Sequence, residues 1–170
     1  YGKPDMPMPG AVDVISLNYQ GAGIRGIVGQ YPAFREKFPD KLILSSESAS
    51  ALSSRGEYLF PVAGAISGPV RPGSGGDPKT HHVSAYEMHA ADFGSSPDRV
   101  FASDDQHPYV AGEFVWTGFD YLGEPTPYYT SRSSYSGIVD LAGFPKDRFW
   151  LYQARWRPEL KFPHILAHWK

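Results

Sequence analysis

The chain has 170 residues and no cysteine, and its 16 Lys and Arg nearly balance its 18 Asp and Glu. The lack of cysteine excludes a disulfide framework, a zinc–thiolate site and a cysteine nucleophile. The balanced charge disfavours nucleic acid as a partner, and no apolar run approaches the roughly 20 residues of a membrane span, so we expect neither kind of partner.

Two buried strands with a helix between them are predicted in the first third of the chain. Residues 13–18 (DVISLN) and 41–46 (KLILSS) are short apolar runs, which are typical of covered strands. Residues 32–38 (PAFREKF) begin with proline, carry apolar residues at helical spacing, and are followed by Pro39 as a stop. This succession of strand, helix and strand predicts an α/β fold with parallel strands.

The middle of the chain is predicted to be a loop followed by a second helix. Residues 56–79 are rich in Gly, Pro and Ser and show no periodicity, which indicates a long excursion over the surface. Residues 83–93 (VSAYEMHAADF) carry apolar side chains at helical spacing and end at Gly94, so we expect a helix there.

A third strand and a third helix are predicted in the last part of the chain. Residues 109–116 (YVAGEFVW) form the strand, and residues 117–140 are rich in Gly, Tyr and Pro. Residues 146–156 (KDRFWLYQARW) place aromatic and Leu residues on one helical face. Residues 162–169 are expected to form a strand or a linker.

A glycine pattern after the first strand raises the possibility of a nucleotide site. Gly21, Gly23 and Gly26 form a GxGxxG pattern, and Glu47 ends the next strand about where a ribose-binding acid is expected. In a dinucleotide site, however, a helix begins inside the pattern so that its N-terminus meets the pyrophosphate, and Pro32 falls where that helix should continue. We therefore favour a plain glycine loop over a nucleotide-binding βαβ unit.

Polar and aromatic side chains stand at the ends of all three predicted strands. Glu47 follows the second strand, at the edge where parallel α/β folds place their active sites. Asn18 and Tyr19 end the first strand, and Trp116 and Asp120 end the third. Aromatic faces that stack on a sugar ring, beside polar groups that bind its hydroxyls, are typical of a carbohydrate site. The alternatives are ordinary core packing and a solvated or capping role for the glutamate.

Other chemically interesting residues have simpler explanations. Glu113 lies inside the third strand as either a paired internal acid or a rim residue, and we favour a structural role. The neighbouring His81 and His82 point in different directions and lack a carboxylate at metal-pair spacing, so no metal site is predicted. The serines after Glu47 lack a G-x-S-x-G elbow, which leaves a serine nucleophile with little support.

Four segments together carry a family resemblance. YVAGEFVWTGFDYLGEPTPY (109–128) and SSYSGIVDLAGFPKDRFWLYQARW (133–156) closely resemble the last barrel strand and following segment of glycoside hydrolase family 2 enzymes of the β-galactosidase type. DVISLNY (13–19) and LILSSESAS (42–50) look like strands 6 and 7 of the same catalytic barrel. The resemblance is weakest over residues 56–80. It implies a partial (β/α)8 TIM barrel, roughly strands 6 to 8 with their helices.

The resemblance also implies an activity and roles for individual residues. The enzymes that the chain resembles are retaining glycosidases, so the resemblance implies hydrolysis of terminal non-reducing β-D-galactosides by double displacement. Glu47 matches the nucleophile of these enzymes. Tyr19 matches the tyrosine that hydrogen-bonds this carboxylate, and Asn18 lies beside it. Trp116 matches the tryptophan of the non-reducing sugar subsite, with Asp120 as a further candidate for that pocket. No cofactor is implied.

Two features depart from a complete enzyme of this family. Retaining hydrolysis needs a second carboxyl group as acid/base, which the family carries in an Asn-Glu pair after strand 4, and no such pair occurs here. A complete barrel takes about 250 residues, so strands 1 to 5 are expected to be missing. We expect residues 1–157 to be a barrel portion that pairs with the rest of the barrel and is inactive alone. Residues 158–170 would be a linker or the first strand of a following domain.

Some alternatives stay open at this point. Lys146 falls near the point where related glucuronidases present a lysine to a sugar carboxylate, but Asp147 beside it favours a structural role. The specificity could instead be that of a β-glucuronidase or β-mannosidase. The chain could also be a catalytically incomplete carbohydrate-binding or scaffold fragment that keeps the Trp116 platform. Either a periplasmic or a cytoplasmic bacterial location is compatible with the composition.

Overall fold

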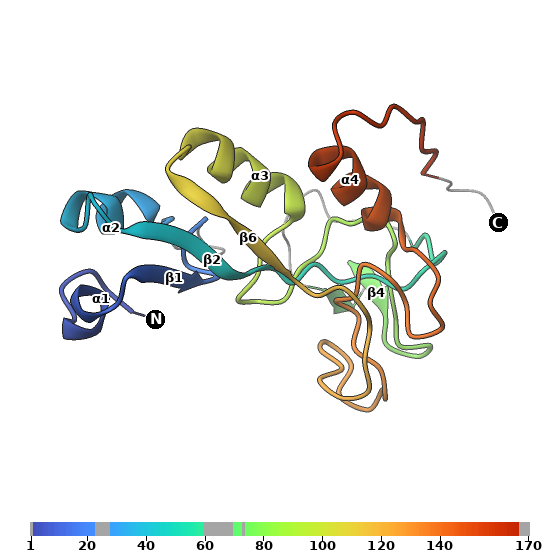
Figure 1. Ribbon diagram of the computed structural model, residues 1–170. Coiled ribbons are helices and arrows are strands. Elements are labelled where there is room, and N and C mark those ends of the chain that lie inside the picture. The colour runs from blue at the N-terminus through green and yellow to red at the C-terminus, as the bar shows by residue number, and fades with distance from the viewer. Residues whose placement is uncertain (1, 23–27, 60–69, 73, 167–170) are drawn as a thin grey trace.

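The computed structural model describes residues 2–22, 28–59, 70–72 and 74–166. Their central feature is a three-stranded, fully parallel sheet in the order β1-β2-β6 (Figure 1). The three strands are β1 (Val14–Asn18), β2 (Leu42–Ala49) and β6 (Val110–Trp116). All three strands that the sequence predicts are therefore present, and the fold is a mixed α/β arrangement built on a parallel sheet.

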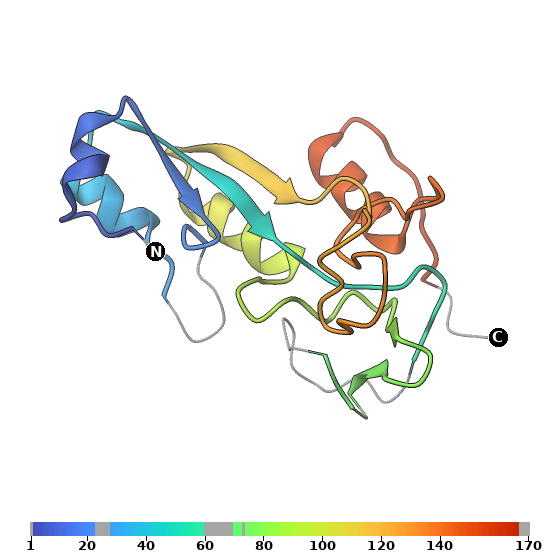
Figure 2. The ribbon, with the colours of Figure 1, turned by 90° about the horizontal axis from the view of Figure 1, so that it is seen from below.

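The remaining elements are four helices and a second, small sheet among the described residues. The helices are α1 (Pro7–Ala11), α2 (Tyr31–Lys37), α3 (Pro97–Gln106) and α4 (Asp147–Trp156). The small sheet contains β3 (Arg71–Pro72), β4 (Gly75–Asp77) and β5 (His82–Val83). In Figures 1 and 2, the long connections after β2 and β6 gather beyond the C-terminal ends of the strands, with α4 next to them.

One apolar cluster joins α2 to the sheet. Because side chains alternate along a strand, Ile15 and Leu17 of β1 point to one face, where they pack with Tyr31 and Phe34 of α2 and Ile43 of β2. The intervening residues of β1 are exposed on the opposite face. The sequence signals of α2, namely its proline start and its apolar spacing, thus correspond to the face that it buries.

The helix predicted over residues 83–93 is wrong. Backbone amides in this stretch donate to distant segments instead of to the preceding helical turn: Ser84 N to Gly75 O at 2.7 Å and Ala91 N to Ser50 O at 3.0 Å. Glu87 moreover has a φ of 59°, which a right-handed helix does not allow. Long-range hydrogen bonds therefore override the local spacing.

The helix that precedes β6 is α3, which the periodicity did not reveal. Its start signal is nevertheless present, since Ser96 and Pro97 stand at the positions where capping residues and proline are favoured. Phe101 of α3 packs with Tyr152 of α4 and with Ile138, so this helix connects the sheet to the C-terminal part of the chain.

Other sequence expectations fall partly outside the described residues. Gly23 and Gly26 of the glycine pattern lie there, as do residues 60–69 and 73 of the predicted loop 56–79. Residues 162–166 are irregular, and the rest of the predicted strand or linker lies outside. Within the described residues, no helix has the length and apolarity needed to cross a membrane.

Candidate active site

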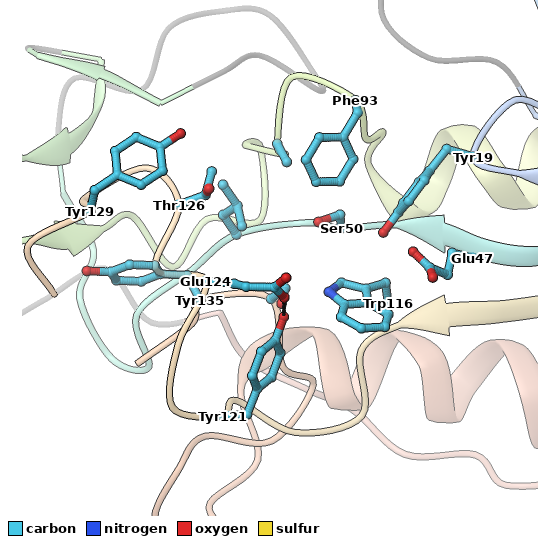
Figure 3. A pocket seen from close by; sticks show the side chains of 13 residues that line it. Tyr19, Glu47, Ser50, Phe93, Trp116, Tyr121, Glu124, Thr126, Tyr129 and Tyr135 are labelled. Atoms are coloured by element: carbon cyan, nitrogen blue, oxygen red, sulfur yellow. Dashed lines mark hydrogen bonds between the residues drawn. The ribbon is translucent and has the colours of Figure 1, made fainter. Parts of the chain in front are cut away.

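A cavity of about 460 Å³ opens at the C-terminal end of the parallel sheet. Its described wall contains side chains from the ends of all three strands and from the loops beyond them (Figure 3). The lining residues are Tyr19, Glu47, Ser50, Leu52, Ala91, Phe93, Trp116, Tyr121, Glu124, Thr126, Tyr129, Tyr135 and Ser136. The sheet therefore brings together three of the five residues predicted from the sequence, one from each strand end.

Glu47 and Tyr19 form the polar centre of this cavity. In Figure 3 the phenol of Tyr19 points toward the carboxylate of Glu47. Burial, the negative charge of Glu47 and a hydrogen bond to that carboxylate all raise the pKa of Tyr19. Tyr19 therefore stays protonated and donates its hydroxyl hydrogen to Glu47. This contact orients the Glu47 carboxylate inside the cavity.

Aromatic rings surround this pair. Phe93 packs edge-on against Tyr19 with ring centroids 5.1 Å apart, and Trp116 packs edge-on against Tyr121 at 5.9 Å. Trp116 ends β6 and lies next to Glu47 in Figure 3. Apolar ring faces beside a carboxylate can bind the CH face of a sugar while leaving its hydroxyls to polar groups.

Glu124 adds a second carboxylate to the cavity wall. It accepts a hydrogen bond from the hydroxyl of Tyr121. Burial, together with this hydrogen bond and the charge of Glu124, raises the pKa of Tyr121 to about 12. Glu124 was not predicted as a site residue from the sequence, although it lies in the segment 109–128 that carries the family resemblance.

Two predicted site residues lie elsewhere. Asn18 is exposed on the other face of β1, where it lines a separate, largely apolar cavity of about 570 Å³ beside α1. Asp120 is buried and pairs with Lys146, with Oδ2 and Nζ 2.6 Å apart. Its other oxygen accepts a hydrogen bond from Gly137 N at 2.7 Å. The structure thus brings neither Asn18 nor Asp120 into the Glu47 cavity.

Glu113 is a paired internal acid, one of the two arrangements that the sequence leaves open. It lies on β6 and accepts a hydrogen bond from the Ser48 hydroxyl of β2. Burial raises the pKa of Glu113 to about 7, and the charge of Asp104 adds to the effect, whereas the Ser48 hydrogen bond opposes it. Glu113 does not line the Glu47 cavity.

Within the described residues, no group of three or more His, Asp or Glu side chains is arranged to hold a metal ion. The two adjacent histidines do point in different directions. His81 stacks on Tyr128 with centroids 5.4 Å apart, and His82 lies 3.5 Å from Glu57. The structure therefore gives these histidines structural contacts of their own.

A carboxylate flanked by aromatic rings at the carboxyl end of a parallel sheet is typical of a carbohydrate site. The chain is 40% identical over 161 residues, 94% of its length, to Beta-galactosidase BoGH2A of Bacteroides ovatus, and it spans 18% of that protein. No family model matches the chain. The sequence resemblance to glycoside hydrolase family 2 is confirmed over nearly the whole chain.

Solved structures of two Bacteroides enzymes also resemble the chain in fold. A β-glycosidase from Bacteroides vulgatus is 26% identical and matches with a TM-score of 0.67 over 93% of this chain and 22% of its own. β-Glucuronidase 2 of Bacteroides uniformis is 19% identical and matches with a TM-score of 0.58 over 91% of this chain and 16% of its own. The second similarity is one of fold alone.

Proposed function

We propose that this chain supplies the nucleophile and part of the sugar pocket of a retaining β-galactosidase-type glycosidase. The observation that carries the proposal is the pairing of Glu47 with the protonated phenol of Tyr19 inside an aromatic-lined cavity at the carboxyl end of the sheet. The 40% identity to a β-galactosidase over 94% of the chain supports the substrate class.

The proposed reaction is a double displacement at the anomeric carbon of a terminal β-D-galactoside. The Glu47 carboxylate attacks this carbon, the bond to the leaving oxygen breaks, and an acid/base carboxyl group gives that oxygen a proton. The same group then takes a proton from water, which attacks the glycosyl ester and frees Glu47. Tyr19 orients the nucleophile, and Trp116 provides a stacking surface for the sugar ring.

We further propose that the parallel sheet is a section of a (β/α)8 barrel, with β1, β2 and β6 as barrel strands 6 to 8. The matched relatives are several times longer, which leaves room for the other strands and for the acid/base residue. The rest of the barrel would be the partner of residues 1–157, and residues 158–170 would connect to a following domain. A polypeptide limited to these 170 residues is expected to be inactive.

The charges at the cavity favour a neutral sugar over a uronic acid. The charged side chains that line its described part are Glu47 and Glu124. A glucuronate would add a third negative charge to a partly desolvated site, which costs free energy unless a cation pairs with it. This charge pattern favours galactoside over glucuronide.

Mechanism-based labelling tests the proposal. The longest natural polypeptide that contains this chain is treated with an activated 2-fluoro-β-galactoside, and the labelled peptide is mapped by mass spectrometry. We expect the label on Glu47, and we expect Glu47→Gln to abolish turnover while sparing sugar binding. A label on another residue would refute the assignment. If the natural protein has little turnover and Glu47→Gln does not reduce it further, the second candidate is favoured. This candidate is a carbohydrate-binding fragment that keeps the aromatic wall of the cavity.

A further inference from the structure

Two buried cations lie behind one wall of the Glu47 cavity. Lys146, directly before α4, and Arg148, in the first turn of that helix, each have only 1% of their surface exposed. Buried cations are costly unless acceptors surround them, so the identity of those acceptors indicates what the cations do.

The ammonium group of Lys146 uses all three of its hydrogen-bond donors. Its Nζ lies 2.6 Å from Asp120 Oδ2 and donates to the carbonyl oxygens of Ser53 at 2.8 Å and Tyr135 at 3.0 Å. One of its acceptors is thus a charge partner, and the other two are backbone groups from segments more than 80 residues apart.

The guanidinium group of Arg148 joins the same two segments. Its Nε lies 2.9 Å from Glu87 Oε2, and Nη1 donates to the carbonyls of Ala51 and, at 3.4 Å, Ser136. Nη2 donates to the hydroxyl of Ser53, which in turn donates to Glu87 Oε1 at 2.9 Å. We call the pair of cations the Lys146–Arg148 clamp.

The backbone held by the clamp forms the cavity wall. Leu52, between two residues whose carbonyls the clamp binds, lines the cavity. Tyr135 and Ser136 also line it, and the clamp binds the carbonyls of both. The main chain of this wall is therefore fixed from behind, while its side chains face the space in front of Glu47.

We propose that Lys146 and Arg148 are positioning residues that set the shape of the sugar pocket by holding the two backbone segments of its wall together. This inference rests on the proposed function of the cavity, and it assigns neither cation a contact with the sugar. Because the clamp does not bind the Glu47 carboxylate, its loss should weaken sugar binding more than the chemical step.

The clamp also makes sugar binding sensitive to alkaline pH. Burial, together with the charge of Arg148, lowers the pKa of Lys146 to about 8, and the opposing charges of Asp120 and Glu87 do not fully compensate. When the ammonium group loses a proton, one of its three acceptors loses its donor. We therefore expect KM to rise as the pH increases through this value.

The first test uses the longest natural polypeptide that contains the chain and compares Lys146→Met with Arg155→Met. Arg155 lies on the same helix but pairs with the exposed Asp105, so it serves as the matched control. Amide hydrogen exchange is followed in peptides covering residues 50–54 and 134–138, and KM and kcat are measured with an aryl β-galactoside. In Lys146→Met we expect exchange at least about tenfold faster and KM about tenfold higher, with kcat changed less.

Several outcomes would overturn the inference. One is a folded Lys146→Met protein whose hydrogen exchange and KM are unchanged. Another is a fall in kcat with no change in KM, because partial unfolding lowers the active fraction of the enzyme without changing KM. If Lys146→Met does not fold, Asp120→Asn provides the second test: loss of this carboxylate lowers the pKa of Lys146, and the alkaline rise in KM should begin at lower pH. An unmoved profile would contradict the clamp. Hydrogen exchange tests the clamp without requiring turnover, and 2-fluoro labelling of Glu47 tests the proposed function without changing the clamp. Failure of the clamp and failure of the proposed function are therefore distinguishable.

Discussion

Glu113 allows the structure to be tested through the pH dependence of stability. Its carboxyl group lies between β6 and β2, and its pKa is raised from the ordinary value of 4.5 to about 7, mainly by burial. The folded state thus binds the proton more tightly than the unfolded state does. The contribution of Glu113 to stability is therefore greatest below the unfolded pKa and is lost as the pH rises toward 7.

The size of this effect follows from the two pKa values. A full conversion at about 1.4 kcal/mol per pH unit gives roughly 3 kcal/mol, and the remaining contact of Glu113 with solvent reduces this to about 2 kcal/mol. Glu113→Gln is neutral at every pH and keeps a polar group opposite Ser48. We therefore expect the stability of the variant, relative to the natural protein, to increase by about 2 kcal/mol between about pH 4.5 and pH 8.

Equilibrium urea unfolding, followed by tryptophan fluorescence across this pH range, measures the difference directly. Ser48→Ala is an informative companion variant, because the Ser48 hydrogen bond lowers the pKa of Glu113. Removal of this hydrogen bond should raise the pKa of Glu113, so the loss of stability should occur at higher pH. A stability difference between Glu113→Gln and the natural protein that stays constant with pH, or changes in the opposite direction, would refute the reasoning.

Three further substitutions test the core, a tight backbone contact and the site. Phe34→Ala removes an aromatic ring that is 1% exposed in the α2–sheet cluster and leaves a cavity there. The free energy of unfolding, measured in urea, should fall by about 3–5 kcal/mol. Gly94→Ala places a Cβ 2.2 Å from the carbonyl oxygen of Ala49, so a loss of about 2 kcal/mol or more is expected, and an unchanged unfolding midpoint would contradict this contact. Trp116→Ala should raise KM for an aryl β-galactoside about tenfold while leaving the 2-fluoro label on Glu47, whereas an unchanged KM would exclude the stacking role.

Local sequence signals predict the sheet well because each strand is a short apolar run. The helix expected over residues 83–93 shows where such signals fail. The apolar spacing there is real, but its amides bond to segments such as Gly75 and Ser50, which no local window can reveal. The environments of Asp120 and Lys146 were likewise unpredictable, since their ion pair joins residues on separate loops. The structure places Lys146 in a structural network, the role that the sequence analysis favoured over contact with a sugar.

Asn18 and Tyr19 lie in different places because regular alternation along β1 fixes Asn18, whereas an irregularity at the end of the strand fixes Tyr19. Side chains alternate along a strand, so adjacent residues cannot both face the same cavity, and with Leu17 packed toward α2 the next side chain must point away. The register between β1 and β2 then shifts, so that Asn18 pairs with Glu47 and one residue of β2 is skipped.

Tyr19 completes the turn with a φ of 59°, and its amide donates to the carbonyl oxygen of Glu47 at 2.8 Å. The hydroxyl of Ser45 stabilises the same shift, because its single hydrogen is shared between that oxygen at 2.9 Å and the carbonyl oxygen of Leu17 at 3.2 Å. The left-handed conformation costs a non-glycine residue of order 1 kcal/mol, which these hydrogen bonds offset. In return, both the amide and the phenol of Tyr19 reach Glu47. A regular strand end would separate the carboxylate from this donor, so the irregularity itself builds the polar centre of the site.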